Sequence, residues 1–371
     1  MRRDTEIKLE HPPEVDVLSV HTTTFLPVWL EKTLLVIAGL SLFILALRML
    51  TKGAGAVGPL MIHALHIHGA TNTLGFGWLF ASIVLSGAPV ASVALTFLAS
   101  HVLTPLETFT MITGSRLGAD MIVFFIGFIY FLRGHPKSTS ISLGVIAQSV
   151  TATTYLPALP FGYWLLTSHV MDHAHVALPK SITGLVQVVF DPIVTFTAAH
   201  LNAWLVFLLG LGAVLIAFRI LDRALPHLDA DQRAFGRVGR LVYRPFAMFA
   251  LGMIVTLIGM SVSVSISLLV PLSARGIIRR ENTVPYILGS NLATLIDKLL
   301  PAVLVGHPLA VPIILIEMVT ISTISLGIML FFYRPYERFI LGVLDRVIES
   351  NRALALFMGL MVGVPLVLIL I

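Results

Sequence analysis

The chain has 371 residues, of which 57% are hydrophobic and 12% are charged. Soluble domains carry about 25% charged residues, so this composition excludes an ordinary soluble protein and predicts one embedded in a membrane. The net charge of +5 suggests nucleic acid at first, but the basic residues cluster at the ends of apolar segments, as the positive-inside rule expects. We therefore expect no nucleic-acid partner. The chain has no cysteine, which excludes disulfides and thiolate metal sites.

Several apolar segments reach the roughly 20 residues that a helix needs to cross about 30 Å of hydrocarbon. Short stretches of alternating hydrophobicity, which are typical of transmembrane barrels, do not occur. The expected fold class is therefore all-α, a polytopic membrane protein. The clearest segments cover residues 33–50, 204–221, 309–332 and 353–371.

Charge along the chain predicts its topology. The first 32 residues mix Arg2, Arg3 and Lys8 with acidic residues and lack the layout of a cleaved signal peptide, so we expect a cytoplasmic tail. Residues 222–244 contain five arginines and are expected to form a cytoplasmic linker. The expected organisation is a tail at 1–32, a first membrane repeat at 33–168, an extracytoplasmic segment at 169–202, a second repeat at 203–335, and a cytoplasmic loop with a terminal transmembrane helix at 336–371.

The two halves of the sequence resemble each other at a constant shift. Residues 86–120 align without a gap on residues 261–295, while "LALRMLTK" (45–52) matches "IAFRILDR" (216–223) and "ISLGVI" (141–146) matches "ISLGIM" (324–329). Apolar matches arise by chance in such a chain, so only small and polar ones carry weight. These pair Gly77 with Gly252, Ser86 with Ser261, Ser92 with Ser267, Thr108 with Thr283, Gly114 with Gly289 and Ser115 with Ser290.

A duplicated fold follows from these matches, and charge gives its orientation. With both the tail and the linker cytoplasmic, the apolar segments at 33–50 and 204–221 run in opposite directions, so the repeats are inverted. Inverted repeats are typical of secondary transporters, whose sites lie near the membrane midplane where both repeats contribute broken helices. The alternative is a duplication that serves packing alone.

The first break expected in each repeat lies near residues 85–92 and 260–267. Gly87 and Pro89 fall in the middle of a long apolar run, where Pro removes a helical donor and Gly relaxes the backbone. In the second repeat, serines at 261, 263, 265 and 267 alternate with apolar residues, and an extended turn would gather their hydroxyls on one side. Non-helical backbone at this depth is tolerated where it lines a watered cavity.

The second expected break is "GSRLGAD" (114–120) and its counterpart "GSNLATL" (289–295). Gly114 and Gly289 are predicted to open helices whose free amides face an anion. Charged side chains are costly in a bilayer and are functional candidates by default. An alternative is that Arg116 and Asp120, four residues apart, simply neutralise each other. The charged candidates are Arg116, Asp120, Asp297 and Lys298.

These motifs resemble those of the type II sodium/phosphate cotransporter family, whose repeats each carry a Gln-Ser-Ser-Ser-Ala-Thr and a Gly-Ala-Asn-Ile-Gly-Thr motif. Here "LSGAPV" (85–90) and "MSVSVS" (260–265) occupy the first motif's place, and "GSRLGA" (114–119) and "GSNLAT" (289–294) the second. The likeness covers about residues 33–335. It implies a multi-pass cell-membrane symporter, not an enzyme, that binds inorganic phosphate and sodium between two hairpins and needs no other cofactor.

The sequence departs from the family pattern at defined positions. Leu85 and Met260 replace the motif Gln, Arg116 replaces an Asn, and we expect no counterpart of the C-terminal soluble domain of many bacterial relatives. Arg116 offers a planar fork that suits an oxyanion. The expected substrate- and ion-binding residues are Ser86, Arg116, Ser261, Ser263, Ser265, Ser290, Asn291 and Thr294; Gly87, Pro89, Gly114 and Gly289 are expected to shape the breaks, and Asp120, Asp297 and Gln148 are further candidates.

Gln148 belongs to the hydroxyl-rich stretch "AQSVTATTYLP" (147–157). Its amide is a candidate substitute for the missing motif Gln, although helical hydroxyls that bond back to their own carbonyls explain the rest of the stretch. Histidines at 63–68 and 172–175 are read as loop residues rather than metal ligands. Asp191 before Pro192 is read as a helix-start residue, with a cation or proton site as the alternative.

Other functions stay open. No nucleophile motif or phosphate-binding loop appears, which makes a membrane enzyme a weak alternative. A carrier of another anion, or a non-transporting scaffold or regulator of the same fold, fits the altered motifs. The sequence is also compatible with a homo-oligomer.

Overall fold

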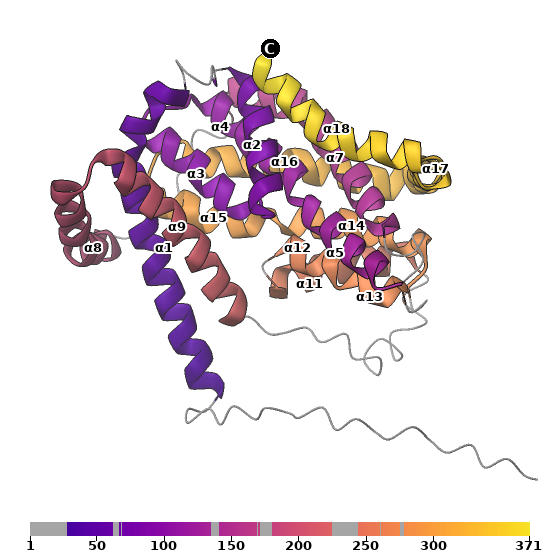
Figure 1. The fold of residues 1–371 in the computed structure, drawn as a ribbon, viewed down its shortest axis with the longest axis horizontal. Helices are drawn as coiled ribbons and strands as arrows, with labels where there is room; N and C mark the ends of the chain where they lie inside the picture. Colours follow the sequence, from indigo (N-terminus) through magenta and orange to yellow (C-terminus); the bar gives the residue numbers. More distant parts are fainter. Residues whose placement is uncertain are drawn as a thin grey trace, which may run out of the picture.

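The computed structural model describes residues 28–61, 67, 69–134, 141–168, 170, 180–224, 244–259, 261–274 and 278–371, and all regular elements in these ranges are helices (Figure 1). Six helical stretches there are long and apolar enough to cross a membrane. The expected all-α membrane fold is therefore confirmed. The six are Trp29–Pro59, Pro105–Leu132, Ala203–Ala224, Arg280–Val305, Ala310–Glu349 and Asn351–Leu370.

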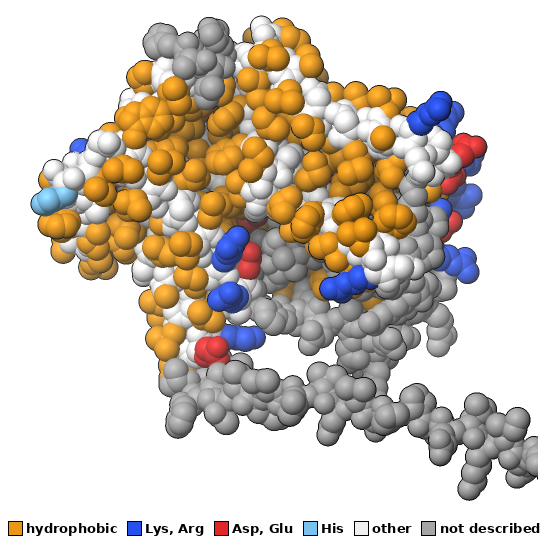
Figure 2. Space-filling view, in the orientation of Figure 1, with side chains coloured by type: hydrophobic (Ala, Val, Ile, Leu, Met, Phe, Trp, Pro, Cys, Tyr) orange, Lys and Arg blue, Asp and Glu red, His pale blue; other side chains and the backbone are white. Residues whose placement is uncertain are grey.

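Large apolar side chains cover much of the surface. Figure 2 shows hydrophobic groups over most of one face, with charged groups gathered beside the free end of the first helix and around α17 (Tyr333–Glu349). Ile83, Val188 and Phe331 each expose more than 70% of their surface. Such a continuous apolar surface suits contact with lipid rather than water.

The first long helix of each half lies against the other. Gly39 of α1 (Val28–Pro59) faces Leu221 of α9 (Ala203–Ala224), whereas Gly53, further along α1, touches the backbone of Phe207. The contacts run in reverse order, so the two helices are antiparallel (Figure 1). A Cβ on Gly53 would lie 2.6 Å from the Phe207 nitrogen, so this close approach requires glycine.

A second close crossing joins α2 (Ala70–Val84) and α4 (Pro105–Ala119). A Cβ added to Gly77 would overlap the carbonyl of Met111, and one added to Gly114 would overlap the carbonyl of Leu74. The two backbones therefore touch through a pair of reciprocal glycines. Gly114 lies inside α4, so its prediction as a helix start was wrong. The helix instead begins after Thr104, whose hydroxyl accepts from the Glu107 amide in a capping box.

The same crossing recurs between α11 (Pro245–Gly259) and α14 (Arg280–Ala293). A Cβ on Gly252 would overlap the Tyr286 carbonyl, and one on Gly289 would overlap the Phe249 carbonyl. All four positions are those of the first crossing shifted by 175 residues. Gly289 is likewise inside its helix rather than at its start, because the glycine permits the crossing instead of freeing amides.

The break predicted at Gly87 is confirmed. α2 ends at Val84, Leu85 adopts a left-handed conformation with φ of 58°, and α3 (Ala88–Ala99) begins with Pro89 in its first turn. In the second half, Ser261 lies outside any helix, but the following serines lie within α12 (Val262–Ser267), which is followed by α13 (Leu269–Ala274). The extended serine stretch was therefore wrong, since no Gly or Pro interrupts residues 262–267.

The remaining helices complete two further pairs. α5 (Met121–Leu132) packs against α7 (Ser142–Thr167), and α15 (Leu295–Val305) packs against α16 (Ala310–Gly327). α7 also contacts α4, α14 and α16, which places it at the centre of the fold. A short π-helix (Ile328–Phe332) leads from α16 into α17, and α18 (Asn351–Leu370) follows and packs against α2.

Two sequence interpretations are corrected by these bounds. The match of residues 141–146 with 324–329 pairs the start of α7 with the end of α16, so it is a chance match between apolar stretches. A different alignment instead places "AQSVTATT" (147–154) opposite "IEMVTIST" (316–323), with Val150, Thr151 and Thr154 matched to identical residues. Asp191 is not at a helix start: it lies in the middle of α8 (Lys180–His200) and forms an ion pair of 3.6 Å with Arg48.

Candidate functional site

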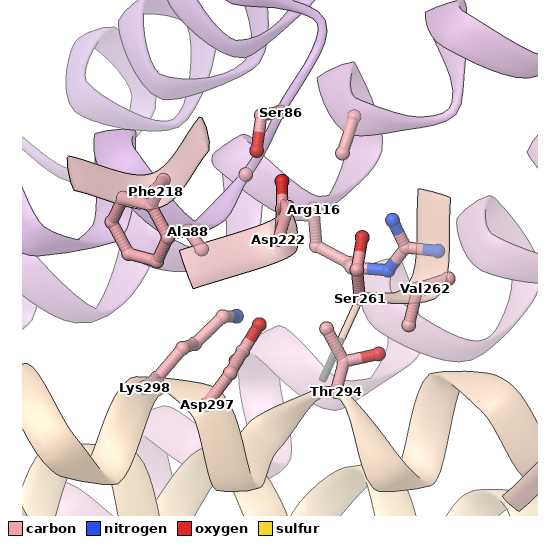
Figure 3. Close-up of a pocket in the computed structure, with 12 residues that line it drawn as sticks. Ser86, Ala88, Arg116, Phe218, Asp222, Ser261, Val262, Thr294, Asp297 and Lys298 are labelled. Atoms are coloured by element: carbon pink, nitrogen blue, oxygen red, sulfur yellow. The ribbon is translucent and has the colours of Figure 1, made fainter. Parts of the chain in front are cut away.

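A small polar cavity lies where both halves of the chain meet (Figure 3). Its volume of about 40 Å³ suits a small inorganic ion or a few water molecules. The break between α2 and α3 brings Ser86 to it, and the break between α14 and α15 brings Thr294. The lining residues that the sequence predicted are Ser86, Gly87, Arg116, Ser261, Thr294, Asp297 and Lys298.

Arg116 reaches the cavity from the last turn of α4. It is buried, and its Nη2 donates to Asp120 Oδ1 and to Asn291 Oδ1, both at 2.8 Å. The Arg116 Nε has no hydrogen-bond partner in the part of the chain that the structure describes. Arg116 and Asp120 therefore do neutralise each other, and Arg116 still lines the cavity with an unused donor.

Asn291 is the centre of a polar network that links α4, α7 and α14. Besides accepting from Arg116, it donates through Nδ2 to Thr151 Oγ1 at 3.1 Å, and its carbonyl accepts from the Tyr155 hydroxyl at 3.3 Å. Asn291 does not line the cavity but fixes the guanidinium that does. Sequence reasoning missed Thr151 and Tyr155 in this role, although both belong to the hydroxyl-rich stretch that had been singled out.

Lys298 enters the cavity from α15 and is held by a second buried ion pair. Its Nζ lies 3.2 Å from Oε2 of Glu317 on α16, and each side chain exposes only 1% of its surface. Sequence reasoning missed Glu317, yet a signal existed. Glu317 is the one charged residue in the apolar segment 309–332, and an acidic group at that depth is expensive unless it is paired.

Two further carboxylates face the same cavity. Figure 3 shows Asp297 beside Lys298 on one helix, both pointing toward Ser86, Asp222 and Arg116. The Oδ1 atom of Asp297 is buried without a hydrogen-bond partner among the described residues. Asp222, at the end of α9, makes no ion pair within the described ranges, and it was missed because it was assigned to the linker.

Several predicted binding residues lie outside the cavity and serve packing. The hydroxyls of Ser265 and Tyr286 share a hydrogen bond of 2.8 Å, and the Ser290 hydroxyl donates to the Gly252 carbonyl at 3.3 Å. These bonds tie α12 and α11 to α14. Pro89 is buried in the first turn of α3. The side chain of Ser263 and all of Met260 lie outside the described residues.

Gln148 is buried on α7, and neither amide atom has a partner within the described ranges. Positions 148, 151 and 155 share one face of a helix, so Gln148 lies on the face that contacts Asn291. It does not line the cavity. In the alignment of residues 147–154 with 316–323, Gln148 falls opposite Glu317.

Metal ligation finds no support among the described residues, where no three His, Asp or Glu side chains come together. The histidines predicted as loop residues at 63–66, 68 and 172–175 lie outside the described ranges. Chemically, the cavity offers hydroxyl and guanidinium donors with two carboxylates, which suits a small ion. Comparison with protein-family models, curated proteins and solved structures finds no match to this chain.

Proposed function

We propose that the protein is a secondary active transporter that moves a small inorganic anion together with a cation. This proposal rests on a polar cavity of about 40 Å³, which is lined by Arg116, Lys298 and hydroxyl groups. The cavity lies among helices that are long and apolar enough to cross a membrane. Phosphate is the anion, sodium the coupling ion and the cell membrane the location that the sequence resemblance implies.

The arrangement of the helices supports two related halves around this cavity. The reciprocal glycine crossings of α2 with α4 and of α11 with α14 match position by position at one shift. Arg116 and Asn291, which correspond at that shift, contact each other directly at 2.8 Å. Contact between equivalent positions is expected at a two-fold axis. The antiparallel pairing of α1 with α9 supports an inverted relation between the halves.

The donors around the cavity support an anionic substrate. The Arg116 Nε has no hydrogen-bond partner among the described residues, Lys298 contributes an ammonium group, and Ser86 and Thr294 contribute hydroxyls. Charge-assisted hydrogen bonds from such groups are the strong ones for an oxyanion. The opposing carboxylates favour simultaneous binding of a cation, because an anion entering alone would meet uncompensated negative charge.

Uptake of labelled phosphate into liposomes that contain the purified protein tests this function. We expect accumulation when a sodium or pH gradient is imposed, and loss of uptake in Arg116→Gln while the protein stays monodisperse. Arg346→Gln is the matched control, because Arg346 is exposed on α17. Unchanged uptake in Arg116→Gln would contradict the assigned site. Transport of sulfate but not phosphate would favour a carrier of another anion, and no transport of either would favour a scaffold.

A further inference from the structure

The charges around the cavity do not balance. Arg116 is paired with Asp120, and Lys298 is paired with Glu317, so both cations already have a buried partner. Asp297 and Asp222 face the same cavity without an ion pair in the described part of the chain. With all groups ionised, the described site carries an excess of negative charge even before an anion binds.

Of the carboxylates at the cavity, Asp297 has the least favourable surroundings for a negative charge. Its Oδ1 atom is buried and accepts no hydrogen bond from any described residue, while the rest of the side chain opens to the cavity. An ionised oxygen buried without a partner is strongly unfavourable, and such a group neutralises instead. Asp297 therefore lacks a cation that binds directly to its Oδ1 atom.

We propose that Asp297 carries the coupling ion of the transporter and that this ion is a proton. This rests on the proposed function of anion transport. The Asp297 carboxylate takes up a proton from the side to which the cavity opens and becomes a neutral carboxyl. The proton and the bound anion are then carried together to the other side. Asp297 then releases the same proton on the opposite side. Each proton therefore neutralises one charge while the anion occupies the donors opposite.

A proton fits the surroundings of Asp297 better than a sodium ion does. A cavity of about 40 Å³ that also takes up an anion leaves little room for a metal ion with its ligand shell. Hard metal ions need several oxygen ligands, and no three Asp, Glu or His side chains come together within the described ranges, so hydroxyl or backbone oxygens would have to complete the ligand shell. A proton needs only the one unpartnered oxygen.

The helices packed against α15 bring few other charges to Asp297. α3 contributes none, and on α1 the charged side chain of Arg48 is paired with Asp191 while Lys52 is exposed. The Arg280 and Glu281 side chains lie at the far end of α14. The charged groups that face the proposed proton site are Lys298 from α15, Glu317 from α16, Arg116 and Asp120 from α4, and Asp222 from α9.

The test uses the purified full-length chain in liposomes with labelled phosphate. For the wild type we expect an inward pH gradient to drive accumulation without sodium. Asp297→Asn should lose all accumulation and keep phosphate/phosphate exchange, which needs no net proton movement. Asp345→Asn is the matched control, because Asp345 is exposed on α17. A pH dye should also report proton uptake when phosphate is added to the detergent-purified wild type, and a smaller uptake in Asp297→Asn.

The outcomes separate this inference from the proposed function. If wild-type exchange occurs but only a sodium gradient drives accumulation, the proton site is wrong and the transport function stands. If the wild type exchanges no phosphate or sulfate, the transport function itself is wrong. Accumulation by Asp297→Asn at the wild-type level would overturn the inference. If that variant loses exchange as well, the dye decides: proton uptake equal to wild type overturns the inference, and reduced uptake supports it.

Discussion

The two glycine crossings share their packing and differ in their chemistry. In α2 with α4 and in α11 with α14, glycines at matched positions bring one backbone onto the other. Shortly after these glycines, the matched side chains diverge: Arg116 corresponds to Asn291, and Asp120 corresponds to Leu295. In α5 and α15 the difference is reversed, with Val123 in the place of Lys298.

This contrast indicates which constraints the fold imposes and which belong to the site. Backbone contact tolerates only glycine, so the crossing is the same in both halves. The charged groups are free to differ, and each half supplies one buried cation to a common cavity. Gln148, which aligns with Glu317, has no partner among the described residues, whereas Glu317 is paired with Lys298.

The largest effect is expected from a methyl group at a crossing. In Gly289→Ala the new Cβ would overlap the Phe249 carbonyl, and a backbone cannot rotate away as a side chain can. We expect a loss of more than about 3 kcal/mol in stability, beyond the usual cost of an overpacked side chain. Size-exclusion profiles and thermal unfolding would measure it.

Gly212→Ala in α9 is the control for this substitution, since no described atom lies within 4 Å of its added Cβ. Gly114→Ala should behave like Gly289→Ala if the two crossings are equivalent. A variant at either crossing that unfolds at the same temperature as Gly212→Ala would show that the close approach is not needed there.

The second-largest loss of stability is expected when one partner of a buried ion pair is removed, and the two pairs should differ. Glu317→Leu leaves the Lys298 ammonium buried without an acceptor, and removing one partner of a buried pair costs about 3–5 kcal/mol. Asp120→Leu should cost less, because Arg116 still donates to Asn291. Thermal unfolding of both variants in detergent would rank them.

The double variant Lys298→Met with Glu317→Leu controls for lost volume. It should recover most of the stability, since apolar residues of similar size often replace a buried pair without loss. If Glu317→Leu and Asp120→Leu lower the unfolding temperature equally, the contact with Asn291 contributes nothing to holding Arg116.

Much of this arrangement could be predicted from the sequence. The length of the apolar segments predicted the helices α1, α9, α16 and α18. Gly87 and Pro89 predicted the break before α3. The constant shift also identified Gly77, Gly114, Gly252 and Gly289. The function of Gly114 and Gly289 was misjudged, because a glycine that opens a helix and one that lets two helices touch look alike until the facing backbone is known.

The parts of the site that were not predicted from the sequence depend on long-range contacts. Glu317 and Lys298 are 19 residues apart, and only the packing of α15 on α16 joins them. Asp222 follows an apolar helix and reads as a linker residue, yet the antiparallel pairing of α1 and α9 brings the end of α9 to the cavity. The apolar match of residues 141–146 with 324–329 also hid the alignment of "AQSVTATT" with "IEMVTIST", which places Gln148 opposite Glu317.

The smallest effect concerns how two helices begin. α4 begins with the capping box of Thr104 and Glu107, whereas the first turn of α16 relies on His307, whose Nδ1 accepts from the Leu309 amide at 3.2 Å. That bond requires a neutral ring. Partial burial, followed by the nearby His101 ring, lowers the pKa of His307 below its ordinary value of 6.5. Its contribution to stability is therefore present above about pH 6.5 and is lost as the pH falls through the lowered pKa.

This dependence should appear as a difference between variants rather than in the wild type alone, because other groups also titrate. Between about pH 7.5 and about pH 5.5, the thermal midpoint of the wild type should fall further than that of His307→Gln. The difference should stay below about 1 kcal/mol, because the ring is partly exposed and solvent screens it. His200→Gln, at the end of α8, should follow the wild type. Equal slopes in all three proteins would mean that the imidazole does not hold the first turn of α16, so that the two helix starts would differ in residue type alone.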